Sequence, residues 1–139
     1  MKFSELTQQA FLRAGFETQR LGHEYVGTEH LLLGLLGDND KSEIAVRLEK
    51  HGINVSVIRA QVESIKTDVL ILMKEKSTNM TPRARQVVTI AEEEAAKRKK
   101  QVVEPEDVLR ALIYEGEGVA ARVLENLGLS RKNFDEQFE

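Results

Sequence analysis

The chain has 139 residues, a length that suits one ordinary domain or two very small ones. It carries a net charge of −3 and contains no cysteine. The absence of cysteine excludes disulfides, thiolate metal sites and a cysteine nucleophile, and the acidic balance gives no electrostatic reason to expect nucleic acid or an anionic membrane. Only 5% of the residues are aromatic, so the core must be built mainly from Leu, Ile, Val and Ala, which favours helices.

Helical spacing of apolar residues, together with capping residues, divides the first half of the chain into four expected helices. They span residues 4–21, 28–36, 42–50 and 55–65. Ser4 is the expected N-cap of the first helix. Gly22, Gly37 and Gly52 follow the first three helices, at positions where a glycine commonly ends a helix.

The second half of the chain is expected to contain four more helices. The first begins after Thr81, an N-cap, has Pro82 in the favoured first position, and ends in the basic run 97–100. The others cover residues 104–113, residues 117–127 and a short segment after Ser130. No parallel sheet is expected from this pattern.

The two halves of the chain repeat each other. Residues 77 positions apart match along the first two helices of each half: Ser4 with Thr81, Ala14 with Ala91, Val26 with Val103, Glu29 with Glu106, Leu32 with Leu109 and Leu35 with Leu112. Later the separation is 76, as between Gly52 and Gly128. Repeated units of this kind bury their apolar faces against each other. We therefore expect an all-α fold in which two tandem four-helix repeats, at 3–65 and 80–139, form one compact pseudo-twofold domain over residues 1–139.

Residues 66–79 connect the two repeats and include the apolar run Val-Leu-Ile-Leu-Met at 69–73. Two interpretations of this run remain open. Either the fourth helix continues through it and packs inward, or the run is an exposed strip that binds a partner.

Two segments look like known chemical motifs but lack the context these motifs need. A zinc-protease helix requires H-E-x-x-H, and Gly27 stands where the second histidine would follow His23. We therefore predict no metal site and no other cofactor, and expect His23 and His30 to cap or pack. The segment EGEGVAA at 115–121 matches a loose dinucleotide fingerprint, but a helix precedes it instead of a strand, so we expect a helix end followed by a helix start.

Catalysis and membrane insertion are not expected. The chain lacks the P-loop sequence and shows no pairing of a nucleophile with a base, so we predict no enzyme activity and no catalytic residue. The N-terminal residues have no secretory signal, and no apolar run approaches the roughly 20 residues that span a bilayer. These features predict a cytoplasmic protein that does not bind membranes.

The start of the second helix is the strongest candidate for a binding site. Glu29 lies in the first turn, beside backbone N–H groups that have no partner within the helix. In one interpretation Glu29 only offsets the helix dipole. In the other, the N–H groups and the Thr28 hydroxyl hold a phosphate while Glu29 pairs with a guanidinium. A ligand with both charges on one side chain would fit the second interpretation.

Three stretches of the sequence stand out together: RLGHEYVGTEHLLLGLL at 20–36, MTPRARQVVTIAEEEA at 80–95 and IYEGEGVAARVLENLGLS at 113–130. They strongly resemble the N-terminal domain of ClpC-type Clp AAA+ unfoldases, over nearly the whole chain and including the duplication. This resemblance implies two all-α Clp repeats that recruit adaptor and substrate proteins to a hexameric unfoldase, which feeds the ClpP peptidase.

The resemblance also implies a ligand, because Gram-positive members of this family read phosphoarginine. In the family, the Glu of a G-T-E-H motif contacts the guanidinium, while nearby Thr hydroxyls and N–H groups hold the phosphate. The matching residues of the first repeat are Ser4, Gly27, Thr28, Glu29 and His30.

The second repeat departs from the motif. Thr81 and Glu106 are retained, but Pro105 replaces the Thr of the motif, and Glu104 and Asp107 add negative charge near the expected phosphate position. Because this charge should repel a phosphate, we expect the second site to be degenerate and the first to be the competent one.

The predicted function is therefore a recruitment module, either the N-domain of such an unfoldase or a free-standing relative that regulates one. The expected partners are adaptor proteins and substrate proteins, including arginine-phosphorylated ones, with ClpP reached only through the unfoldase. The alternative is a nucleic-acid-binding stress protein that uses Lys97–Lys100, although this run contains no aromatic residue. Salt-dependent affinity for DNA would indicate that alternative.

Overall fold

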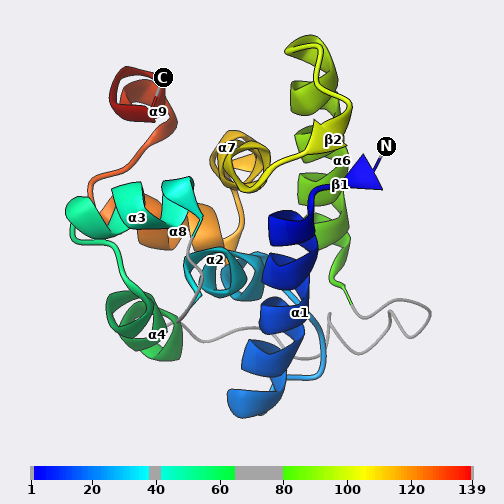
Figure 1. Cartoon of the computed structure of the whole chain (residues 1–139). Coiled ribbons are helices and arrows are strands. Elements are labelled where there is room, and N and C mark those ends of the chain that lie inside the picture. The colour runs from blue at the N-terminus through cyan, green and yellow to red at the C-terminus, as the bar shows by residue number, and fades with distance from the viewer. Residues whose placement is uncertain (1, 38–41, 65–79, 139) are drawn as a thin grey trace.

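The computed structural model describes residues 2–37, 42–64 and 80–138 (Figure 1). The helices of the first half are α1 (Glu5–Arg20), α2 (Thr28–Leu36), α3 (Glu43–Lys50) and α4 (Val55–Ser64). Those of the second half are α6 (Pro82–Lys97), α7 (Pro105–Glu115), α8 (Val119–Asn126) and α9 (Arg131–Phe138). The all-α prediction is confirmed, whereas the apolar run 69–73 lies outside the described residues.

Local capping explains where several helices begin. The side-chain oxygens of Ser4, Ser42 and Thr81 each accept a hydrogen bond from the backbone N–H three residues further on, and Asn54 does the same at the start of α4. Each bond satisfies an N–H group that has no partner within its own helix. The helix starts therefore follow from sequence-local chemistry.

The centre of the molecule is formed by α2 and α7. Every residue of α2 is buried, because its sequence TEHLLLGLL is apolar on almost every side. Among the described helices, α1, α3, α4, α6, α7 and α8 pack against α2. Figure 1 shows α1 and α6 on one side of the central pair, and α3, α4, α8 and α9 on the other.

The α1–α2 crossing is close because α2 has a glycine where the two helices meet. A Cβ at Gly34 would stand 2.1 Å from the carbonyl oxygen of Ala10 and 2.9 Å from the backbone nitrogen of Ala14. The small residues of α1 face this point and are themselves buried. On the same turn, Arg13 Nε donates to the Gly34 carbonyl at 2.9 Å.

Two short parallel pairings join the repeats, and the expectation that no parallel sheet would form was wrong to this extent. Strand β1 (Lys2–Phe3) pairs with β2 (Val102–Val103), with Phe3 opposite Val103, and an isolated bridge joins Met80 to Val26. The two contacts are equivalent, since Met80 and Val26 stand 77 positions from Phe3 and Val103. Strands of two residues are too short to show the alternation that identifies a strand in a sequence.

No helix among the described residues is long and apolar enough to cross a bilayer.

Candidate functional site

The Glu29 carboxylate is folded back over the start of α2. Glu29 is only 5% exposed, and its Oε1 occupies the space beside Gly27, where an added Cβ would approach it to 2.1 Å. Burial raises the pKa of Glu29 from its usual value, while a hydrogen bond from its own backbone N–H and the nearby His23 oppose that rise. No Lys or Arg of the described residues pairs with this carboxylate. Glu29 is thus a buried acid that no Lys or Arg of the described residues neutralises.

His30 completes the cap of α2. The Gly27 N–H donates to His30 Nδ1 at 2.8 Å, so the proton of the neutral ring is on Nε2, which lies 2.8 Å from His23 Nδ1. Burial, and secondarily the neighbouring His23, lowers the pKa of His30 to about 3. As expected, the two histidines cap and pack: His30 caps α2, and His23 packs against the His30 ring. No group of three potential metal-binding side chains is present among the residues that the structure describes.

Thr28 connects the two repeats. Its buried hydroxyl accepts a hydrogen bond from the backbone N–H of Ala120, in the first turn of α8, at 3.1 Å. Gly118 makes room for this contact, since a Cβ there would stand 2.6 Å from Thr28 Oγ1. Gly116, with φ of 76°, ends α7, and Gly118 is the N-cap of α8. The helix end and helix start expected at EGEGVAA are confirmed, but no local signal could reveal a partner 92 residues away.

In the second repeat, a lysine forms ion pairs with the two acidic residues that match Glu29 and His30. Lys100 replaces His23 and donates to Glu106 and to both carboxylate oxygens of Asp107, the latter at 3.2 Å. Asp107 replaces His30, and its Oδ2 accepts the Glu104 N–H at 2.9 Å. The hydrogen bond from Lys100 holds the pKa of Glu106 below its usual value. Since Glu104 carries the Cβ that Gly27 lacks, Glu106 is not folded back, and its side chain is 43% exposed.

The sequence predicted that Ser4 belongs with the first-repeat motif and Thr81 with the second. In the structure each of these residues lies beside the motif of the other repeat. The Thr81 N–H donates to the Val26 carbonyl at 2.9 Å, which places Thr81 beside the first-repeat motif. The Ser4 N–H donates to Val103 at 3.0 Å, which places Ser4 beside the second-repeat motif. The parallel pairings cause this exchange, because each repeat inserts the start of its first helix next to the other repeat.

The basic run 97–100 is largely neutralised by local carboxylates. Lys97 and Arg98 pair with Glu94 at 3.0 and 2.8 Å, and Lys100 pairs with Asp107. These contacts agree with a helix end whose charge is balanced by carboxylates of the protein.

Comparison with known proteins identifies the family. The model of the Clp repeat (R) N-terminal domain matches residues 2–136. The chain belongs to this family. Chaperone protein ClpB of Oceanobacillus iheyensis is 41% identical over 131 residues, which are 93% of this chain and 16% of that protein. Chloroplastic chaperone protein ClpC of Pisum sativum is 38% identical over 138 residues, 98% of this chain and 14% of that protein.

The fold agrees with this family. The N-terminal domain of ClpD from Arabidopsis thaliana superposes with a TM-score of 0.75 at 23% identity, covering 98% of this chain and 91% of that domain. The chain thus spans about one-sixth of the length of the curated relatives that it matches. Because these relatives include both a bacterial and a chloroplast protein, the cytoplasmic location stays a prediction.

Proposed function

We propose that this chain is the docking domain of a Clp-type unfoldase, which recruits substrate and adaptor proteins and carries out no catalysis itself. The proposal is supported by the family match over residues 2–136 and by the similarity to a separate N-terminal domain. Its partners are adaptor proteins and client proteins, some of them phosphorylated on arginine, while ClpP is reached only through the unfoldase.

The first repeat is proposed to bind phosphoarginine, and the observation that supports this is the environment of Glu29. A buried carboxylate with a raised pKa and no Lys or Arg partner in the described residues gains most from an incoming cation. A guanidinium supplies that cation with two parallel N–H donors. The phosphate binds the backbone N–H groups at the start of α2, in the motif of Gly27, Thr28, Glu29 and His30.

A single movement of Glu29 prepares both halves of this site. In the structure, the carboxylate accepts a hydrogen bond from its own backbone N–H. When Glu29 rotates outward to meet the guanidinium, that N–H becomes available to the phosphate. The hydroxyl next to this end of α2 is that of Thr81, because the Thr28 hydroxyl is already bonded to Ala120.

The second repeat does not bind the mark strongly, for a reason beyond its extra negative charge. Lys100 already pairs with Glu106 and Asp107. These carboxylates therefore gain little from the guanidinium of a ligand. Ser4, which lies beside this motif, keeps its hydroxyl in the α1 cap.

The experiment is a titration of free phosphoarginine into isotope-labelled protein, followed by backbone amide shifts, with arginine plus inorganic phosphate as the ligand control. We expect saturable shifts at residues 27–31 and an affinity near the micromolar range, about −8 kcal/mol. Glu29→Gln should weaken binding at least about tenfold, since it removes the charge that meets the guanidinium. The matched change Glu106→Gln should leave the affinity unaltered.

A third variant tests the movement of Glu29. Gly27→Ala adds a Cβ whose nearest neighbours are atoms of the flexible Glu29 carboxyl group, so the protein should fold with the carboxylate displaced outward. Its Glu29 pKa, followed by carboxyl-carbon NMR, should fall toward the usual value. An absence of shifts at millimolar phosphoarginine would contradict the reading of the mark and leave adaptor docking as the proposed function.

A further inference from the structure

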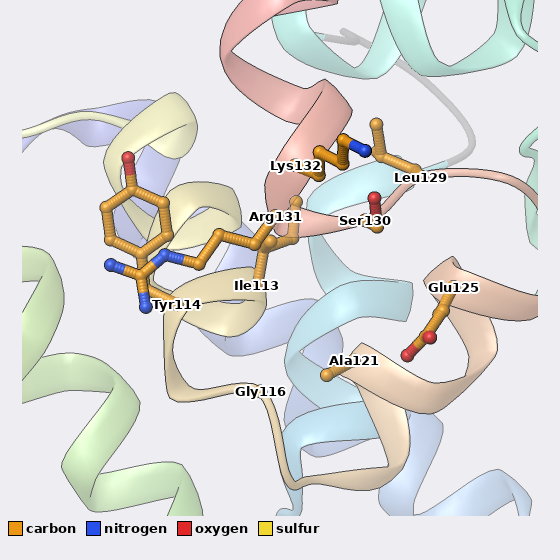
Figure 2. A pocket seen from close by; sticks show the side chains of 9 residues that line it. All are labelled: Ile113, Tyr114, Gly116, Ala121, Glu125, Leu129, Ser130, Arg131 and Lys132. Atoms are coloured by element: carbon orange, nitrogen blue, oxygen red, sulfur yellow. The ribbon is translucent and has the colours of Figure 1, made fainter.

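A pocket of about 300 Å3 lies between the end of α7, the helix α8 and the start of α9 (Figure 2). Its apolar lining comes from Ile113, Ala121 and Leu129, which are 4%, 8% and 2% exposed. The volume is at the lower end of the range for ligand pockets, roughly 300–1,000 Å3. The pocket is therefore large enough for an apolar side chain and open to a peptide.

Two cations and an aromatic ring form one side of this pocket. Arg131 and Lys132 project from the start of α9, and Figure 2 shows the Arg131 side chain extended toward Tyr114. The Arg131 guanidinium carbon lies 4.4 Å from the centre of the Tyr114 ring. The Tyr114 hydroxyl donates to Asp135 Oδ1 at 3.2 Å, which fixes the ring from the other end. The guanidinium thus rests on an ordered surface.

Arg131 and Lys132 have no carboxylate partner among the described residues, unlike most of the basic run 97–100. Glu125 lies on the α8 side of the pocket, across from the two cations. Among the residues that line the pocket, the charge is therefore positive on the α9 side and negative on the α8 side, with apolar residues between them; Asp135 of α9 lies outside this lining, at the Tyr114 hydroxyl.

Comparison of the two repeats separates what the fold requires from what is particular to this pocket. The apolar lining residues correspond to Leu36, Ala45 and Ile53 in the first repeat, all of them apolar. In contrast, Tyr114, Arg131 and Lys132 correspond to a glycine, a valine and a serine. The repeat packs without the aromatic ring and the two charges, so these three residues are not needed to build it.

We propose that this pocket binds a peptide segment of a partner protein in which an apolar side chain stands next to a carboxylate. The apolar side chain occupies the pocket, where the nearly buried Ile113, Ala121 and Leu129 present small apolar areas, and the carboxylate pairs with Arg131 and Lys132. Glu125 repels a second carboxylate on the α8 side, which selects a single acidic residue over an acidic run. The inference rests on the proposed docking function but involves none of the residues assigned to phosphoarginine.

The test uses a blocked peptide, Gly-Ser-Leu-Asp-Ser-Gly, titrated into the labelled protein. Two control peptides replace Asp by Asn or Leu by Ser. We expect saturable amide shifts at residues 113–114 and 129–132. Each control peptide should bind at least about fivefold more weakly than the Leu-Asp peptide. The double change Arg131→Gln and Lys132→Gln should reduce the affinity by at least the same factor. The control double change Lys50→Gln and Lys99→Gln removes the same charge elsewhere and should have no effect.

Three outcomes would overturn the inference: no saturation at about 5 mM peptide, equal binding of the Asp and Asn peptides, or full binding by the Arg131 and Lys132 double variant. Phosphoarginine is added to the same samples as an independent probe. Shifts at residues 27–31 without peptide binding would reject the pocket and keep the proposed mark reader, whereas the opposite result would reject the mark reader and keep the pocket.

Discussion

Glu29 and Glu106 occupy matching positions at the starts of α2 and α7, yet their surroundings differ. Glu29 is buried over Gly27 and its pKa is raised, while Glu106 is half-exposed, pairs with Lys100 and has a lowered pKa. Two neighbours make the difference: glycine at position 27 leaves the space that a Cβ of Glu104 fills, and Lys100 supplies the cation that Glu106 pairs with. The burial and the pKa of each glutamate are thus determined by its neighbours.

The lowered pKa of His30 predicts a loss of stability in mild acid. The unfolded chain binds a proton on His30 below its ordinary value near 6.5, whereas the folded ring does so only near pH 3. The free energy of unfolding should therefore fall as the pH is lowered through this window, by up to about 1.4 kcal/mol per pH unit. Urea denaturation between pH 7 and pH 5 (roughly the range above carboxyl titration) measures this slope.

The variant His30→Asn provides the control for this prediction. An amide oxygen can accept the Gly27 N–H as Asp107 accepts the Glu104 N–H, but the amide does not titrate. Its unfolding free energy should lack most of the slope between pH 7 and 5. An unchanged slope would mean that another group causes the acid sensitivity. Protonation of Glu29, whose folded pKa is raised, acts in the opposite direction and stabilises the fold as the pH falls.

Among the helices, some glycine positions require glycine and others do not. The reason is either a close contact with another helix or a left-handed backbone conformation. Gly34 lies against the backbone of α1, whereas Gly15, also within a helix, has open space around its Cβ position. The αL residue that follows α1 is Gly22, with φ of 72°, while the corresponding residue after α6 is Lys99, with φ of 59°. These pairs permit two matched comparisons.

Substitution of the two helix glycines should have opposite effects. Gly34→Ala must separate α1 from α2, because its Cβ would stand 2.1 Å from a backbone oxygen, and we expect a loss of at least about 2 kcal/mol. Gly15→Ala removes only the entropic cost of a glycine within a helix and should stabilise the fold by about 0.5–1 kcal/mol. Thermal or urea unfolding measures both, and equal effects would contradict the close crossing.

Replacement of Lys99 by glycine should stabilise the protein. A side chain in the left-handed region is strained by about 1–2 kcal/mol, part of which is offset by the greater freedom of glycine in the unfolded chain. We expect a net gain of about 0.5–1 kcal/mol for Lys99→Gly in urea unfolding. Lys99→Ala keeps the Cβ and the strain, so it should show no gain. A gain for both variants would attribute the effect to the lost charge.

For the whole molecule, the decisive contacts run between the repeats. The start of each first helix pairs with the segment before the other repeat's second helix, and Thr28 caps α8 across the same boundary. The central helices α2 and α7 also contact each other. The two repeats therefore share one core and do not behave as two domains on a linker.

Thr28→Val tests the coupling between the repeats. Valine keeps the volume but leaves the buried Ala120 N–H without its acceptor, at an expected cost of about 1–2 kcal/mol. Hydrogen exchange at the Ala120 amide should become faster. The matched change Ser42→Ala removes the cap of α3, the first-repeat counterpart of α8, and should destabilise the protein without this effect at Ala120. Unchanged exchange in Thr28→Val would show that the contact does not connect the repeats.

The sequence by itself determined the helices, their caps and the duplication, because Ser4, Thr81, Pro82 and the helix-ending glycines act on neighbours within a few residues. It also predicted the first-repeat motif and the altered second one. Only the tertiary structure decided which groups share a site: Thr81 lies beside the first motif and Thr28 bonds to α8, although long stretches of chain separate each pair. Local patterns carry no information about such contacts, which depend on how two pseudo-symmetric repeats pack together.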